Sequence, residues 1–383
     1  MKPHDMQPHV SPGGMVLIRH LSAGSAGSAS TMQPPNGNFG GCANTMQYDY
    51  SGSYSVSLTV GEDSTAVIDG TDITASSSGS NDVFATDSGT ALVNDTSIET
   101  MADNSRGLDA TYGGTILANK ITADTQGGHS AIVATDRGSG SISLADATLS
   151  TAGSGSPLLY STGDIQVNNV SGTSSGSQIA GMEGLNTILI KDSTSESTVT
   201  GKTASDPIAN GIIIYQSTSG DAEASTGEPA TFQSVDSTLS SAIGSGSMFY
   251  FTNTTADVVL QNTELDFDTD AVTLTDNAAA GSGTGTASDA PITVNVDGTS
   301  TWVVAKDTTI SALNVASGGD GNTVTIVANG KTVVSGSGDV TVTVTGSYST
   351  SVSAGSDTEL SSDTIDRSEF DSRFGTSTAW TMA

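Results

Sequence analysis

Short apolar runs return along this chain at a spacing of roughly 25 residues, and this repeat limits the possible folds more than any other feature. Residues 66–73 read AVIDGTDI and residues 91–98 read ALVNDTSI, so each apolar triplet is followed by polar residues and a further isoleucine. Corresponding runs begin at Ile116, Ile142, Ile165, Ile188, Phe232, Val258 and Ile292. Runs of this length, bounded by Asn, Asp and Gly, are typical of short strands joined by tight turns.

A second apolar run lies in the middle of most repeats, for example at residues 82–85 and 130–134. Each repeat then contains two or three short strands, which cannot bury an apolar face alone. Stacking of successive repeats joins these faces into one continuous core. We therefore predict an all-β fold, a right-handed parallel β-helix (β-solenoid), with coils of roughly 25 residues and capped ends.

The predicted chain has three parts. Residues 1–44 are rich in Pro, Gly, Ser and Met without a hydrophobic period, which predicts a flexible leader. Residues 45–345 carry the parallel β-helix, with loop insertions near 191–231 and 278–290, where the repeat is interrupted. Because an open solenoid must cover its terminal strands, residues 346–383 are expected to form a C-terminal cap or tail.

The chain is strongly acidic, with 11 Lys and Arg against 41 Asp and Glu and a formal net charge of −30. Such a surface repels phosphate backbones and anionic lipids, so neither nucleic acid nor a membrane is an expected partner. Cys42 is the only cysteine, which excludes an intrachain disulfide and a cysteine-based zinc site. No stretch has the length and apolarity needed for membrane insertion, and no export signal is visible.

Parallel β-helices include polysaccharide lyases and glycoside hydrolases, so a polysaccharide-active enzyme is the main alternative to a contact protein. The basic residues that a lyase needs are few, although coil stacking would align Arg106 with Arg137. His129 is the only histidine within the expected solenoid, so the sequence predicts no Ser-His-Asp set. The sequence therefore favours a non-catalytic role, and a polysaccharide-active enzyme remains the alternative.

Asp266, Asp268 and Asp270 form the densest alternating acidic motif of the chain. On one strand these three side chains share a face, which suits a weak Ca²⁺ site or the carboxylate pair of a hydrolase. The competing interpretation is a solvated edge strand with Phe267 in the core. No cofactor other than weakly held Ca²⁺ is expected.

Exposed aromatic rings are the residues that stack on sugars in many carbohydrate-binding sites. The candidates for such ligand binding are Tyr112, Tyr160, Tyr215 and Trp302. Each of them can equally be a residue of the core, and Tyr112 and Tyr160 are the best surface candidates because they lie beside turns.

Residues 43–54 (ANTMQYDYSGSY), 181–187 (GMEGLNT) and 215–221 (YQSTSGD) carry a resemblance to a known group of proteins. These segments resemble the adhesin-like right-handed parallel β-helix surface proteins of gut anaerobic bacteria. The resemblance extends from about residue 43 to the C-terminus and rests on the general pattern of the repeats, with no specific motif.

The resemblance to these surface proteins implies an extracellular or cell-surface scaffold that contacts a glycan or a surface protein of the host or of neighbouring cells. It brings no established active-site motif that can be placed on this sequence.

Overall fold

The computed structural model describes residues 54–204, 206–216, 230–252, 254, 256–267 and 364–377, together with the side chain of Leu313. It also gives the backbone of short strands at 9–10, 15–18, 21–23, 270–275, 292–296, 301–302, 308–310, 312–315, 324–325, 332–335, 341–344 and 348–349. The chain is an all-β solenoid of about 8 turns with coils about 25 residues apart, which confirms the predicted fold class.

Its contacts divide the chain into two compact units. The first unit contains Met1–Ser177 and Ile365–Ala379, and the second contains Gln178–Thr364 and Trp380–Ala383.

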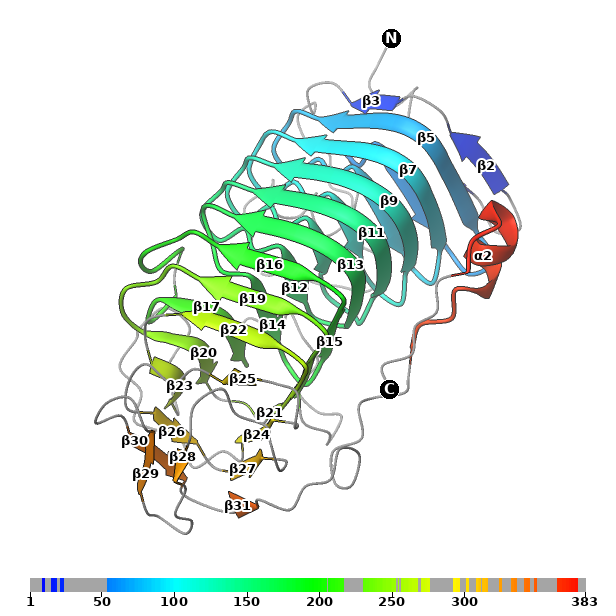
Figure 1. Cartoon of the computed structure of the whole chain (residues 1–383). Helices are drawn as coiled ribbons and strands as arrows, with labels where there is room; N and C mark the ends of the chain where they lie inside the picture. The colour runs from blue at the N-terminus through cyan, green and yellow to red at the C-terminus, as the bar shows by residue number, and fades with distance from the viewer. Residues whose placement is uncertain are drawn as a thin grey trace. The chain divides into compact units, whose positions relative to one another are not determined.

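The first unit is built from two parallel sheets (Figure 1). One sheet has long strands of 11 residues each: β5 (Thr65–Ala75), β7 (Thr90–Thr100), β9 (Thr115–Thr125), β11 (Ser141–Thr151) and β13 (Asp164–Ser174). The other has the short strands β4 (Ser57–Val60), β6 (Val83–Thr86), β8 (Leu108–Ala110), β10 (Val133–Thr135) and β12 (Leu159–Ser161). All neighbours within each sheet pair in parallel and in register.

Each long strand bends at one residue that lies in the left-handed region of φ. These residues are Gly70, Asp95, Lys120, Asp146 and Asn169, with φ between 50° and 58°. Gly, Asp and Asn adopt this conformation more readily than other residues, which explains their return at the same point of each coil. Lys120 is the exception, and its side chain is exposed.

A column of serine hydroxyls ties successive coils together in the first unit. Ser105 Oγ accepts a hydrogen bond from the Ser80 N–H at 3.1 Å and donates one to the Ser77 carbonyl at 2.9 Å. Ser130 and Ser156 repeat both contacts on the next two coils. These hydroxyls satisfy backbone groups at turns, where the ladder between strands is interrupted.

The second unit continues the parallel pattern. One sheet contains β14 (Ala180–Glu183), β17 (Asn210–Tyr215), β20 (Ser247–Thr252) and β23 (Asp270–Thr275). The strands of the other are β15 (Thr187–Lys191), β16 (Thr194–Ser197), β18 (Ala230–Val235), β19 (Thr238–Ser241), β21 (Ala256–Gln261), β22 (Glu264–Phe267), β24 (Ile292–Val296), β25 (Thr301–Trp302), β27 (Ala312–Val315) and β31 (Tyr348–Ser349).

A further sheet in the second unit departs from the all-parallel pattern. It consists of β26 (Thr308–Ile310), β28 (Val324–Thr325), β29 (Thr332–Ser335) and β30 (Thr341–Val344). β29 pairs antiparallel with both β28 and β30.

The ends of the chain contain more regular structure than the sequence indicates. Within the expected leader, β1 (His9–Val10) pairs with β4, while β2 (Met15–Ile18) and β3 (Leu21–Ala23) pair with β5. These strands differ from the expectation of a leader without regular structure. Near the other end, the helix α2 (Ser368–Phe374) belongs to the first unit.

The two expected insertions have different outcomes. Within the segment 191–231, the strands β16 and β17 pair in parallel with strands of neighbouring coils, and residues 217–229 lie outside the described residues. The segment 278–290 lies outside the described residues.

Candidate functional site

A regular array of outward side chains lies on the second half of each long strand in the first unit. In these segments buried residues alternate with exposed or half-exposed ones, so every second side chain faces solvent. We call this array the hydroxyl face. Its residues are Asp72, Thr74, Ser97, Glu99, Thr122, Asp124, Thr148, Ser150, Ser171 and Thr173.

Parallel pairing arranges the hydroxyl face in two straight columns. Ser97 faces Thr122 across one strand boundary, and Thr122 faces Thr148 across the next. Neighbouring residues of a column are therefore about 4.8 Å apart, the spacing of paired strands. Seven of the ten side chains carry a hydroxyl and three a carboxylate, and the four at the β11 and β13 end are all hydroxyls. The face offers many hydrogen-bond donors and acceptors on a rigid sheet, with no basic or aromatic group among its residues.

The second unit has a shorter array of the same kind. Thr238 pairs with Thr194 on one side and Glu264 on the other, and Ser240 pairs in the same way with Glu196 and Asp266. Neither array was predicted from the sequence. Its signal is the alternation of Ser, Thr, Asp and Glu after the turn in each repeat.

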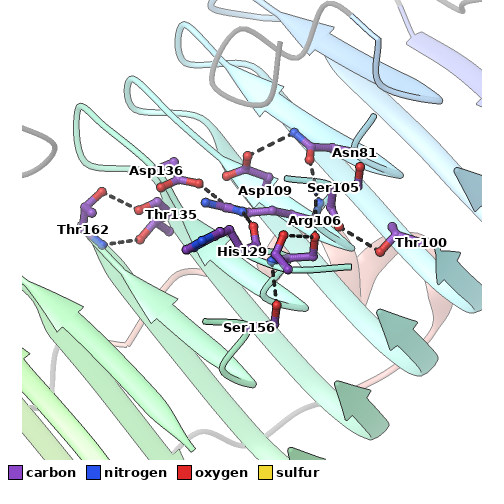
Figure 2. A network of polar contacts seen from close by, with 12 residues as sticks. Asn81, Thr100, Ser105, Arg106, Asp109, His129, Thr135, Asp136, Ser156 and Thr162 are labelled. Carbon is purple, nitrogen blue, oxygen red and sulfur yellow. Dashed lines mark hydrogen bonds and ion pairs between the residues drawn. The ribbon is translucent and has the colours of Figure 1, made fainter. Parts of the chain in front are cut away.

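A buried polar network connects several turns of the first unit on its other sheet (Figure 2). Arg106 forms an ion pair with Asp136 and donates a hydrogen bond to the carbonyl of His129. The Arg106 N–H donates to Asn81 Oδ1 at 2.7 Å, and Asn81 Nδ2 donates to Asp109 Oδ2 at 3.2 Å. The network therefore joins residues from consecutive coils.

The Arg106 guanidinium is buried and bound to Asp136 and to the His129 carbonyl. Arg106 is 7% exposed and Asp136 is 2% exposed, and the guanidinium carbon lies 5.8 Å from the centre of the Tyr160 ring. Burial lowers the pKa of His129, the Arg106 charge lowers it further, and Asp103 acts in the opposite direction. A guanidinium held in this way cannot reach a substrate as the base of a lyase. We assign the network to holding the turns together.

The expected alignment of Arg106 with Arg137 is wrong. The Arg106 N–H binds Asn81, whereas the Arg137 carbonyl accepts a hydrogen bond from the Tyr112 N–H at 2.9 Å. The two arginines therefore occupy different columns of the stack, and no paired basic site results from them.

The four aromatic candidates come from different elements of the two units. Tyr112 is partly exposed at a turn with φ of 47°, and Tyr160 in β12 is partly buried beside Arg106. Tyr215 is partly exposed at the end of β17. Trp302 ends β25, and its side chain lies outside the described residues. None of the four belongs to the hydroxyl face.

The three aspartates of the acidic motif do not lie on one strand. Asp266 is exposed on β22, and Asp270 begins β23, which pairs in a different sheet. The side chains of Asp268 and Asp270 lie outside the described residues. The expectation of one shared strand face is therefore wrong. Among the side chains that the structure describes, no group of three or more His, Cys, Asp or Glu could hold a metal ion.

Asp82 is a buried carboxyl that forms no ion pair with any residue in the described part of the chain. It is 0% exposed, and within the described part of the chain neither carboxyl oxygen makes a hydrogen bond of good geometry. Burial raises the pKa of Asp82 well above its usual range, the Glu99 carboxylate adds to the rise, and the Glu99 backbone amide opposes it. Asp82 therefore keeps its proton in the folded protein under conditions in which the unfolded chain releases it.

Replacing Asp82 with Asn should remove a pH-dependent loss of stability. The unfolded carboxyl releases its proton above about pH 4, so the wild-type free energy of unfolding falls as the pH rises from there towards the raised pKa of the folded state. We expect Asp82→Asn to be more stable than the wild type near pH 7 and about equal to it near pH 4, because the amide has no proton to release. Urea unfolding at both pH values measures the difference, with the exposed Asp87→Asn as control. A difference that does not change with pH would contradict the assignment.

Among the described residues, no helix is long and apolar enough to cross a membrane. Comparison of the sequence and structure with known proteins finds no matching family model, no matching curated protein and no matching solved structure.

Proposed function

We propose that this chain is a non-catalytic, adhesin-like scaffold of the bacterial cell surface or secreted fraction, and that its hydroxyl face contacts glycans. The observation that carries this proposal is the two-column array of Ser, Thr, Asp and Glu on β5, β7, β9, β11 and β13. Hydroxyls both donate and accept hydrogen bonds, as sugar hydroxyls do, so the two surfaces are chemically complementary.

The repetition of the array favours a polymer over a small ligand. Single hydrogen bonds between solvated hydroxyls contribute little, because each replaces a bond to water. A polymer that lies along the columns meets the same groups on successive coils, and its later contacts form at a high effective concentration.

The charge of the face narrows the class of glycan. Asp72, Glu99 and Asp124 place carboxylates on three consecutive coils, and the whole chain has a net charge of −30. Anionic polymers are repelled by such a surface, so the expected glycan is neutral or carries amino groups.

Binding of the full-length protein to an array of soluble glycans and to insoluble polysaccharides tests the proposal. We expect retention on at least one neutral or amino-containing glycan, without release of shorter products. The variant Thr122→Lys/Thr148→Lys should bind at least tenfold more weakly, because two long cationic side chains interrupt one column. The control Ser88→Lys/Ser139→Lys adds the same charge at exposed positions in the turns that precede β7 and β11, at the other end of these strands from the face.

Equal loss of binding in both variants would assign the effect to charge alone. Shortening of any polymer by the wild-type protein would favour the polysaccharide-active enzyme instead.

A further inference from the structure

The C-terminal segment 364–377 packs against one outward column of the first unit. We call this the outer column. Its residues are Val67, Leu92, Leu117, Ser143 and Gln166, which face one another along neighbouring strands. The column is apolar on its first three coils and polar on the last two. Figure 1 shows α2 beside the strands β5 and β7.

The apolar part of the outer column is covered by aromatic and aliphatic side chains of the segment. Phe370 is 0% exposed and packs against Val67, Leu92 and Leu117. Ile365 and Phe374 pack partly buried against the same cluster. Three leucine or valine side chains on consecutive coils thus lie under one buried phenylalanine.

The polar part of the outer column receives the hydrogen bonds of the segment. Arg367 Nη1 donates to the Ser143 carbonyl at 2.7 Å and to Ser143 Oγ at 2.9 Å, and Nη2 donates to the Ala118 carbonyl at 3.1 Å. The Ile365 N–H donates to Gln166 Oε1 at 2.9 Å. Phe370 therefore meets the apolar part of the column, whereas Arg367 and the Ile365 amide meet its polar part.

The segment depends on the outer column for its own structure. The helix α2 has 7 residues and no side-chain cap at its start, and it ends at Gly375 in the left-handed region. Helices this short are not stable alone in water. Burial lowers the pKa of Arg367 to about 10, against the effects of Asp371 and Asp146, so the guanidinium remains cationic at neutral pH. It lies 4.7 Å from the centre of the Phe370 ring.

We propose that the outer column is a peptide-binding site whose ligand is the chain's own C-terminal segment 364–377, and that this segment is a releasable latch. The latch folds when it docks and unfolds when it leaves, because the column supplies the contacts that hold its shape. Few side chains hold it, and it docks on residues that lie far from it in sequence, for example 199 positions away at Gln166. Release therefore does not require the coils to separate. It exposes an apolar strip on three coils that a second such peptide can occupy.

Peptide binding to the full-length protein tests the site. In Arg367→Ala/Phe370→Ala the latch loses its two buried side chains and leaves the outer column open. A labelled peptide of residues 364–377 should bind this variant at least tenfold more tightly than it binds the wild type, whose own latch competes for the column. Fluorescence anisotropy measures both affinities.

The variant Arg373→Ala, which changes an exposed residue of the same helix, is the matched control and should behave as the wild type. A peptide with the Arg367 and Phe370 changes should bind none of the proteins. Equal peptide binding to the wild type and the double variant, or none to either, would overturn the proposal.

Hydrogen exchange of the wild-type protein tests release even if the double variant does not fold. The Asp371 and Gly375 amides donate to the Arg367 and Asp371 carbonyls within the latch. They should exchange together and at least 100-fold faster than the strand amides of β7 and β9. Exchange of latch and strands at one common rate would show that the segment is a fixed part of the fold and would overturn the proposal.

Discussion

Gly153→Ala should destabilise the first unit by about 3 kcal/mol or more. An added Cβ at Gly153 would lie 1.7 Å from the Gly127 carbonyl oxygen and 2.3 Å from its carbon. Both atoms belong to the backbone of the preceding coil, so no side-chain rotation can relieve the contact. The two coils would have to separate locally, which weakens the ladder of hydrogen bonds that joins them. Urea unfolding followed by circular dichroism measures the loss.

Gly201→Ala is the matched control for this prediction. A Cβ at Gly201 meets nothing within 4 Å, so the same chemical change carries no steric penalty there. We expect its stability to stay within about 0.5 kcal/mol of the wild type. If both variants unfold at the wild-type urea concentration, the close approach of the coils at Gly153 is not present in solution.

The sequence predicts the stacked coils because inward side chains dominate the repeat. Apolar residues at the start of each coil and Asn, Asp or Gly at the bend are local signals, and both return at the same spacing. The close approach at Gly153 has no such signal, because glycine is frequent throughout the chain. The polar network around Arg106 also escapes sequence analysis, since it joins Asn81, Arg106 and Asp136 through contacts between different coils.

The apolar middle residue of each triplet is explained only by the structure. In a strand with one buried face, the middle residue of Ala66, Val67 and Ile68 should be exposed, yet all three are buried. The middle position lies on the outer column and is covered by Phe370. Where this position is polar, at Ser143, the segment places Arg367. An uninterrupted triplet thus indicates a strand covered on both faces, but the covering segment is too distant in sequence to be deduced.

Arg106→Met should cost about 3 to 5 kcal/mol of stability. The substitution keeps much of the side-chain volume but leaves the Asp136 carboxylate buried without its cation and the His129 carbonyl without its donor. Removal of the carboxylate as well, in Arg106→Met/Asp136→Leu, should recover part of the loss, because no unpaired charge then remains. Denaturant unfolding of the two single variants and the double variant gives the coupling energy.

Lys191→Met is the control that distinguishes the loss of the buried Arg106 ion pair from the loss of an ordinary surface ion pair. Lys191 Nζ lies 3.4 Å from Asp236 and 3.7 Å from Asp192, and these carboxylates are 41% and 49% exposed. Water screens such pairs, so we expect a loss of about 0.5 kcal/mol that disappears in about 1 M salt, whereas the Arg106 loss should remain. If Arg106→Met instead folds as stably as the wild type, the guanidinium is not needed to hold the turns.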